Sequence, residues 1–113
     1  MPYIEAKLSI KLEEKQKFEL QEKLTDIVSA AFSKPKTYIM TNIEDEKAMY
    51  MAGSQPDSAA YIAIGLLGSA TKPACQTATK GICEILNSYG ISGSKVYVTY
   101  HPTDLWGWNG SMF

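Results

Sequence analysis

The order of hydrophobic periodicities along this chain restricts its possible folds more than any single motif does. Residues 3–11 alternate between apolar and polar side chains, which is the period of a strand with one buried face. Residues 13–34 then repeat apolar side chains at the spacing of one helix face. Pro35 ends this helix, because the residue before a proline is pushed out of the helical region. Residues 37–43 predict a second strand.

The second half of the chain repeats this order of elements. Residues 59–67 predict a strand, and their nearly continuous apolar run is typical of a strand covered on both faces. A second helix is expected to begin after Thr71, its N-cap, and to stop at Gly90. Residues 95–101 predict the last strand, and the tail that follows has too many aromatic residues for a solvated end.

Two strand–helix–strand units in succession predict an α/β (α+β) fold with duplicated βαβ units. The expected architecture is a single domain, residues 1–113, with a four-stranded mixed sheet and two helices on one face. Two helices leave the other sheet face bare, whereas the run at 59–67 favours cover on both faces. We therefore expect an oligomer rather than a monomer.

Composition excludes several classes of function. The net charge of −1 offers no basic surface for nucleic acid, so an RNA-binding domain of the same layout is disfavoured. All 11 basic residues are lysines, so an anion site has to use Lys or backbone N–H groups in place of an arginine. One His, and two Cys eight residues apart in one predicted helix, make neither a zinc site nor a disulfide.

Targeting signals are also missing from the sequence. No apolar stretch is long enough to cross a membrane, and the chain has no secretory leader of basic, apolar and small residues. We expect a cytoplasmic protein with no membrane partner. If it acts outside the cell, it is secreted without a signal peptide.

Pro2 allows two interpretations. A proline can open a strand, because the first position need not donate a hydrogen bond to the sheet. Small second residues, proline among them, also permit removal of the initiator methionine, which would leave Pro2 with a free secondary amine. An α-amino group has a pKa of about 7.7–8.0, and burial lowers that pKa, so a buried amine can act as a base near neutral pH.

Five short motifs point to one family. In order, they are the initial MP, SKPKTYIM at 33–40, AIGLLG at 63–68, KVYVTY at 95–100 and WGWNGSMF at 106–113. Together they resemble macrophage migration inhibitory factor and its relatives in the tautomerase superfamily, over the whole chain. The resemblance implies a homotrimer of the tautomerase fold with active sites at the subunit boundaries. It also implies cofactor-free keto–enol isomerisation of phenylpyruvate- or dopachrome-type substrates.

The resemblance assigns roles to residues of this chain. Pro2 is the expected catalytic acid/base, and Lys34 is the expected catalytic cation that faces the carboxylate of a small aromatic 2-keto acid. The backbone N–H of Ile64 is expected to hold that carboxylate as well. Without the resemblance, the preferred interpretation of Lys34 is a surface lysine favoured by the negative end of the first helix.

The resemblance also implies an aromatic substrate pocket. Tyr38, Trp108 and Phe113 are expected to line it, with Tyr97 reaching in from the neighbouring subunit. Tyrosines are also ordinary strand residues, which is the alternative for Tyr38 and Tyr97. An apolar wall would bind an aromatic substrate and lower the pKa of the Pro2 amine. No metal and no cofactor are expected in this site.

The sequence departs from the family pattern at several places. Thr99 stands where the best-known members carry asparagine, Trp106 replaces a small aliphatic residue at the pocket rim, and Ser33 replaces the glycine before the lysine. Thr99 and Trp106 are still counted as substrate-binding residues, although a threonine binds with a different geometry and a second indole can narrow the entrance. His101, the only histidine, matches no family site and is expected to lie in a loop.

A second function stands beside the enzyme. The family also contains cytokine-like secreted signalling proteins that act through receptor binding, and in such a protein the tautomerase activity would be vestigial or minor. Retention of Pro2, Lys34 and the aromatic residues favours the enzyme, whereas a cell-surface receptor leaves no local signature in the sequence. The CxxC motif of some members is absent, so no thiol–disulfide activity is predicted.

Overall fold

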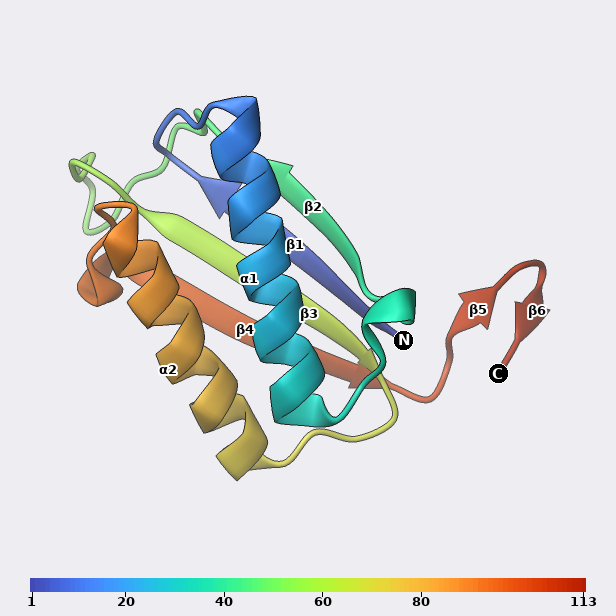
Figure 1. Cartoon of the computed structure of the whole chain (residues 1–113). Coiled ribbons are helices and arrows are strands. Elements are labelled where there is room, and N and C mark those ends of the chain that lie inside the picture. Colours follow the sequence, from blue (N-terminus) through green and yellow to red (C-terminus); the bar gives the residue numbers. More distant parts are fainter.

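The computed structural model describes all residues 1–113 and shows a four-stranded sheet with two helices on one face (Figure 1). The sheet order is β2-β1-β3-β4, with β1 parallel to β2 and antiparallel to β3, and with β3 parallel to β4. Each half of the chain therefore forms one βαβ unit, as predicted. In chain order the elements are β1 (Pro2–Leu8), α1 (Glu14–Phe32), η1 (Lys36–Tyr38), β2 (Met40–Glu44), β3 (Ala60–Leu67), α2 (Lys72–Ser88), η2 (Gly93–Lys95), β4 (Val96–Thr103), β5 (Gly107–Trp108) and β6 (Ser111–Met112).

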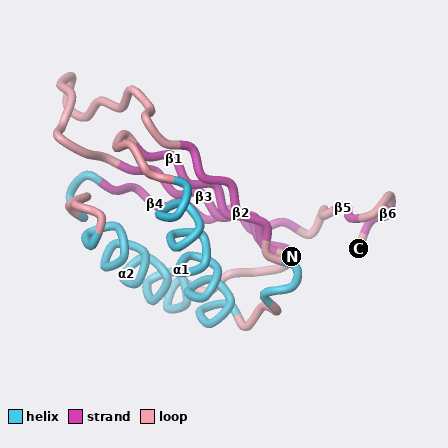
Figure 2. The backbone as a smooth tube through the Cα atoms, turned by 45° about the horizontal axis from the view of Figure 1, so that its top comes forward, coloured by secondary structure: helices cyan, strands magenta, loops and turns pink.

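The sheet separates a covered face from a bare face. Both helices lie on the same side of the sheet, and in the single chain no helix covers the other side (Figure 2). Burial alternates along β1 and β3, as the period of two requires, so every second residue lies under the helices. The apolar run at 59–67 was expected to be covered on both faces, but in the single chain only one face is covered. The residues of β3 that stay partly exposed are Tyr61, Ala63, Gly65 and Leu67.

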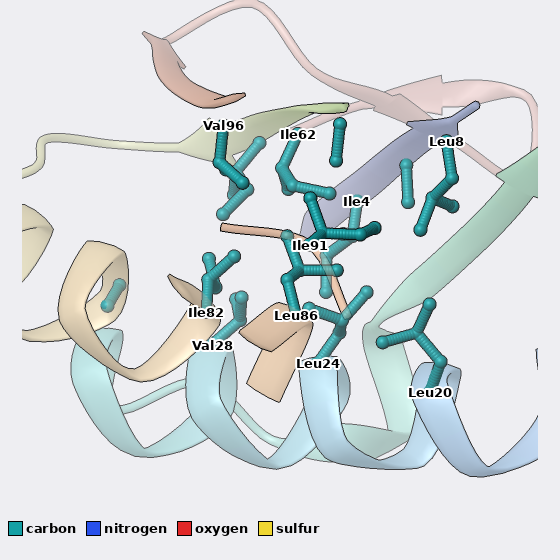
Figure 3. Packing of buried hydrophobic residues seen from close by; sticks show 14 of the residues in the cluster. Ile4, Leu8, Leu20, Leu24, Val28, Ile62, Ile82, Leu86, Ile91 and Val96 are labelled. Carbon is teal, nitrogen blue, oxygen red and sulfur yellow. The ribbon is translucent and has the colours of Figure 1, made fainter. Parts of the chain in front are cut away.

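The core lies between the helices and the covered sheet face (Figure 3). The predicted apolar stripe of α1 buries Leu20, Leu24 and Val28 completely. The stripe of α2 buries Ala78, Ile82 and Leu86, with the predicted Ile85 and Tyr89 at its edge. Burying each large aliphatic side chain contributes about 1.5–3 kcal/mol, so this single layer supplies most of the drive to fold. The sheet residues that complete the core are Ile4, Ala6, Leu8, Ala60, Ile62, Ile64, Leu66 and Val96.

The helix ends follow local chemistry. The side chain of Thr71 accepts a hydrogen bond from the Ala74 N–H at 3.2 Å, which confirms Thr71 as the N-cap of α2. Gly90, just beyond the end of α2, has the positive φ of 85° expected of a helix stop. The first helix was expected to run to residue 34, but it ends at Phe32, because Ser33 takes up a left-handed φ of 52°. Neither helix is both long and apolar enough to cross a membrane.

Strand boundaries differ from the prediction in several places. The first strand ends at Leu8 and not at residue 11, and β3 and β4 begin at Ala60 and Val96, one residue later than expected. The strand expected at 37–43 begins only at Met40, because the Tyr38 N–H donates to the Pro35 carbonyl at 3.2 Å and closes a short 3-10 turn. At the other end, β4 continues past residue 101 to Thr103. His101 therefore lies in a strand, opposite Gly65, and not in a loop. β4 can extend to Thr103 because β3 continues to Leu67 beside it and pairs with it residue by residue.

The aromatic tail forms a small hairpin, β5–β6, that projects from the body of the protein (Figure 1). Asn109 and Gly110 join its strands, with φ values of 51° and 80°. Two positive φ values in a two-residue loop match the hairpin turn that Asn-Gly prefers. The Phe113 N–H donates to the Trp106 carbonyl at 3.0 Å, so the chain end is tied back to the start of the hairpin.

Asp45, in the acidic turn after β2, joins the sheet to the start of α1. Its carboxylate accepts a hydrogen bond from the Leu12 N–H at 3.0 Å and pairs with the Lys17 ammonium at 3.4 Å. Only 17% of its side chain is exposed. The Leu12 hydrogen bond, and after it the Lys17 charge, lower the pKa of Asp45, while partial burial acts in the opposite direction.

Asp45→Asn should lower the melting temperature by a few degrees at pH 7, because the amide can still accept from Leu12 but loses the charge. A carboxyl whose pKa is lower in the folded chain stabilises it fully above the unfolded pKa of about 3.9, and this contribution disappears as the pH falls through the folded pKa. Thermal unfolding of both proteins from pH 7 to pH 2 should therefore give curves that converge in acid.

The control for this experiment is Asp26→Asn. Asp26 pairs with Lys36 at 2.6 Å, but 60% of the Asp26 side chain is exposed, so its loss should change little. A difference between wild type and Asp45→Asn that persists unchanged to pH 2 would contradict the assigned role of the charge.

Candidate active site

An open cavity of about 850 Å³ lies where β1 begins. Its wall comes from three segments: the chain start, the stretch from η1 into β2, and the start of the C-terminal hairpin. Parallel pairing of β1 with β2 brings the first two together and sets Tyr3 beside Met40. Seven of the ten lining residues are hydrophobic, and the ten are Met1, Pro2, Tyr3, Thr37, Tyr38, Ile39, Met40, Trp106, Gly107 and Trp108.

Pro2 is held rigidly at one edge of this cavity. It is completely buried, and it lies opposite Leu66 in the antiparallel pairing of β1 with β3. In this chain the Met1 carbonyl, which precedes the proline nitrogen, accepts a hydrogen bond from the Leu67 N–H at 3.2 Å. The pKa of the Met1 amine is lowered from its ordinary value of 8.0, first by desolvation and then by the positive charge of Lys34. An amine at this end of β1 is thus shifted toward its neutral form.

Lys34 is fixed by the end of α1. The left-handed turn at Ser33 reverses the chain, and the Lys34 N–H then donates to the Ser29 carbonyl at 3.1 Å. The Ser29 hydroxyl in turn donates to the Lys34 carbonyl at 2.6 Å. The Lys34 side chain reaches across to the end of β3, where its Nζ donates to the Leu67 carbonyl at 3.3 Å. Its ammonium is therefore anchored next to the start of β1 and is not a free surface charge.

Three aromatic rings form one cluster at the cavity. Tyr38 meets Trp108 edge to face, with ring centroids 5.8 Å apart and an interplanar angle of 85°. Trp108 stacks on Phe113 at 6.2 Å and 20°. Both are geometries that aromatic pairs prefer. Phe113 does not line the cavity itself, but it supports the Trp108 ring that does.

Trp106 lies against the bare backbone of Gly65 in β3. A Cβ placed on Gly65 would stand 3.6 Å from Cζ3 and 3.7 Å from Cη2 of the indole. These are ordinary contact distances, so a methyl group fits at Gly65 in van der Waals contact with the indole. The pair Gly65–Trp106 thus joins the hairpin to the sheet and sets one wall of the cavity.

Five predicted site residues do not line this cavity: Lys34 and Phe113 lie next to it, and three others lie farther away. Ile64 is completely buried in the middle of β3, opposite Ile4 and Tyr100. Tyr97 and Thr99 belong to the bare face of β4, where Tyr97 is 67% exposed. In a single chain the structure therefore gathers Pro2, Tyr38, Trp106 and Trp108, with Lys34 and Phe113 beside them, and leaves out Ile64, Tyr97 and Thr99.

Thr99 belongs to a hydrogen-bonded chain on the bare face. Its hydroxyl lies 2.6 Å from the Tyr61 hydroxyl and 2.8 Å from Nε2 of His101. The Tyr61 and His101 contacts were not expected from the sequence. Side chains two positions apart in a strand lie on the same face, so the sequence could have predicted that Thr99 and His101 are neighbours.

Other site residues were missed because their signal is tertiary. Tyr3 and Met40 line the cavity, and both are the polar-face members of their strands by the period of two. Gly65 contacts Trp106, and the Leu67 carbonyl accepts from Lys34. In both pairs the partner lies more than thirty positions away in the sequence, so no local pattern predicts the contact. No group of three or more His, Cys, Asp and Glu side chains is placed to hold a metal ion anywhere in the chain.

The fold recurs in solved structures. The chain is 27% identical to MIF2 of Leishmania major, with a TM-score of 0.91 over 100% of this chain and 97% of that one. It is 24% identical to the macrophage migration inhibitory factor-like protein of Entamoeba histolytica, with a TM-score of 0.89 over 99% and 98% of the two chains. The homologue from Prochlorococcus marinus is also 24% identical, with a TM-score of 0.86 over 98% of each chain.

Sequence comparison leads to the same group. No curated protein has a matching sequence. The sequence profile of macrophage migration inhibitory factor (MIF), however, matches residues 1–113, which is the whole chain. The fold and the duplicated βαβ layout agree with this match. The chain belongs to the macrophage migration inhibitory factor family.

Proposed function

We propose that this protein is a cofactor-free keto–enol tautomerase of small aromatic 2-keto acids, such as phenylpyruvate, and that the amine of Pro2 is its acid/base. The observation that carries the proposal is the position of Pro2. It is buried and rigid at the edge of an apolar cavity, and Lys34 lies beside it. The proposal requires removal of Met1, because the nitrogen of Pro2 is otherwise an amide without basic character.

The chemistry needs only groups that this site can offer. The neutral Pro2 amine takes a proton from the carbon next to the keto group, and the electron pair of that C–H bond forms the C=C bond of the enolate. The resulting ammonium then returns the proton to the enolate oxygen, which gives the enol. Desolvation and the Lys34 charge lower the pKa of the Met1 amine in this chain, and the same two causes would act on a Pro2 amine freed at this end of β1 and favour its neutral, basic form.

The cavity wall supports an aromatic substrate. The rings of Tyr38, Trp106 and Trp108 offer apolar surface to a planar ring, and Lys34 supplies the single positive charge for a carboxylate. With no arginine in the chain, a lysine is the only side chain of permanent positive charge that can take this role.

The proposal includes a homotrimer. Tyr97 and Met40 are both strongly exposed on the bare sheet face. Large apolar side chains exposed together on one face are typical of a surface that another subunit covers. In the proposed assembly, Tyr97 and Thr99 of one subunit complete the cavity of the next, which is how residues outside the cavity of a single chain would reach the substrate.

The first test is phenylpyruvate tautomerisation by protein whose intact mass shows loss of Met1. Pro2→Gly should reduce kcat/KM by about a hundredfold or more, since the loss of a positioned acid/base typically costs 10²–10⁴. Light scattering on both proteins checks that the oligomer is unchanged. Equal rates in the two proteins would rule out Pro2 as the base, and inactive wild type in its processed form would favour the receptor-binding alternative.

A second test separates charge recognition from catalysis. Lys34→Ala should weaken kcat/KM for phenylpyruvate at least tenfold more than for its methyl ester, which has no carboxylate to bind. The matched control is Lys36→Ala, because Lys36 is an exposed lysine that pairs with Asp26. Equal losses on acid and ester would show that Lys34 does not recognise the carboxylate.

A third test concerns the width of the cavity. Gly65→Ala should leave kcat/KM for phenylpyruvate within about twofold, because a methyl group fits at 3.6 Å from the Trp106 ring. Gly65→Val adds two methyl groups that overlap the indole, so it should displace Trp106 and raise KM several-fold. Tryptophan fluorescence should shift to the red in Gly65→Val alone. The same KM in the valine and alanine variants would remove Trp106 from the substrate wall.

A further inference from the structure

Tyr3 lines the cavity from the strand that begins with Pro2. In the sheet it lies opposite Met40 of β2 and opposite Gly65 of β3. Gly65 has no side chain to fill the place next to Tyr3, and the edge of the Trp106 indole lies there, 3.6 Å from where a Cβ would stand. Tyr3 therefore has large apolar neighbours on both sides, Met40 and Trp106, and all three line the same cavity.

The Tyr3 hydroxyl makes no hydrogen bond within the chain, although Tyr3 is partly buried. The chain has seven tyrosines, and three of them use their hydroxyls in hydrogen bonds: Tyr61, Tyr89 and Tyr100. Three others are exposed, so water can satisfy their hydroxyls: Tyr38, Tyr50 and Tyr97. A tyrosine hydroxyl that is drawn out of water usually has a partner. Among the tyrosines, Tyr3 alone is partly buried and unpaired.

This hydroxyl is open to a ligand. No sealed side-chain nitrogen or oxygen of the chain lacks a hydrogen-bond partner. The unpaired oxygen of Tyr3 therefore reaches open space, and the open space that Tyr3 lines is the cavity. A donor in an apolar cavity is worth more to a ligand than a donor in water, because no solvent competes for it.

The other polar side chains of the cavity wall are less well placed to act on a group held at Pro2. Trp106 turns Cζ3 and Cη2 toward the sheet, so its pyrrole N–H lies at the opposite end of the indole. Tyr3 follows Pro2 directly in the chain, which puts their Cα atoms about 3.8 Å apart. The remaining polar residues of the wall are all exposed: Thr37, Tyr38 and Trp108.

We propose that Tyr3 is a second catalytic residue, whose hydroxyl donates a hydrogen bond to the keto oxygen of the substrate. The inference rests on the proposed function and adds a donor that its mechanism needs. When the Pro2 amine takes the proton, the C–H electron pair forms the C=C bond, and the π pair of the C=O bond moves onto oxygen. A donor already directed at that oxygen stabilises the enolate. Tyr3 keeps its own proton throughout, and the Pro2 ammonium supplies the proton of the enol.

The kinetic test is Tyr3→Phe in protein that has lost Met1. This variant keeps the ring and loses only the hydroxyl. The kcat for phenylpyruvate should fall at least tenfold while KM stays within about threefold, because the hydrogen bond strengthens as charge develops on the oxygen. The matched control is Tyr50→Phe, which removes an unpaired hydroxyl from an exposed residue outside the cavity and should change neither constant. An unchanged kcat in Tyr3→Phe overturns the proposal.

Cinnamate binding checks that the loss concerns the keto oxygen. Cinnamate has the aromatic ring and the carboxylate but no keto group, so Tyr3→Phe should bind it within about twofold of wild type. Light scattering should show the same oligomer for both proteins. A loss of cinnamate affinity as large as the loss of kcat would mean that the hydroxyl shapes the cavity and does not contact the keto group, which also overturns the proposal.

A further measurement detects the hydrogen bond without turnover. Benzoylformate is an aromatic 2-keto acid that cannot enolise, because the carbon beside its keto group carries no hydrogen. With ¹³C at the keto carbon, its resonance should move downfield on binding, since a hydrogen bond to the oxygen polarises the C=O bond. The displacement should be at least halved in Tyr3→Phe and retained in Pro2→Gly. Equal displacements in wild type and Tyr3→Phe contradict the assigned contact.

These results separate the inference from the proposed function. If processed wild type isomerises phenylpyruvate and Pro2→Gly does not, but Tyr3→Phe is as fast as wild type, only the inference fails. If the benzoylformate resonance depends on Tyr3 but processed protein does not isomerise phenylpyruvate, the hydrogen bond from Tyr3 to a keto acid stands and the proposed function fails.

Discussion

The antiparallel register between β1 and β3 is the constraint on which the rest of this structure depends. It sets Pro2 opposite Leu66 and Ile4 opposite Ile64, so the even-numbered residues of both strands lie under the helices. A shift by one residue would turn the core side chains of β1 to the bare face. The same register buries Pro2 and brings the Leu67 N–H to the chain start. Core and candidate site are thus determined by one ladder.

Much of the fold follows from local chemistry and could be predicted. The periods of two and of 3.6 gave the order of strands and helices, and Thr71 and Pro35 marked helix ends for reasons that need no tertiary contact. The wrong predictions concern the ends of strands, because the last residue of a strand depends on which backbone groups are available as hydrogen-bond partners. Tyr38 enters a turn closed by the Pro35 carbonyl, and His101 stays in β4 because β3 continues beside it. The hairpin turn at Asn109 had a local signal that strand periodicity alone does not reveal.

The candidate site was only partly predictable, for a different reason. Pro2, Tyr38, Trp106 and Trp108 were grouped by family resemblance, and they do line one cavity. The contacts that hold the site together join residues far apart in the chain, such as Lys34 with the Leu67 carbonyl and Trp106 with Gly65. No local pattern encodes such a pair, because it exists only once the sheet order is set.

The alternation of buried and partly exposed positions also affects how such a protein can diverge. Side chains under the helices are completely buried, so changes there remove packing and destabilise the fold. Residues on the bare face and in the hairpin, such as Thr99 and Trp106, contribute little to that core. Selection can therefore alter them with little loss of stability. Relatives with under a third of their residues in common can thus keep one scaffold while their pockets diversify.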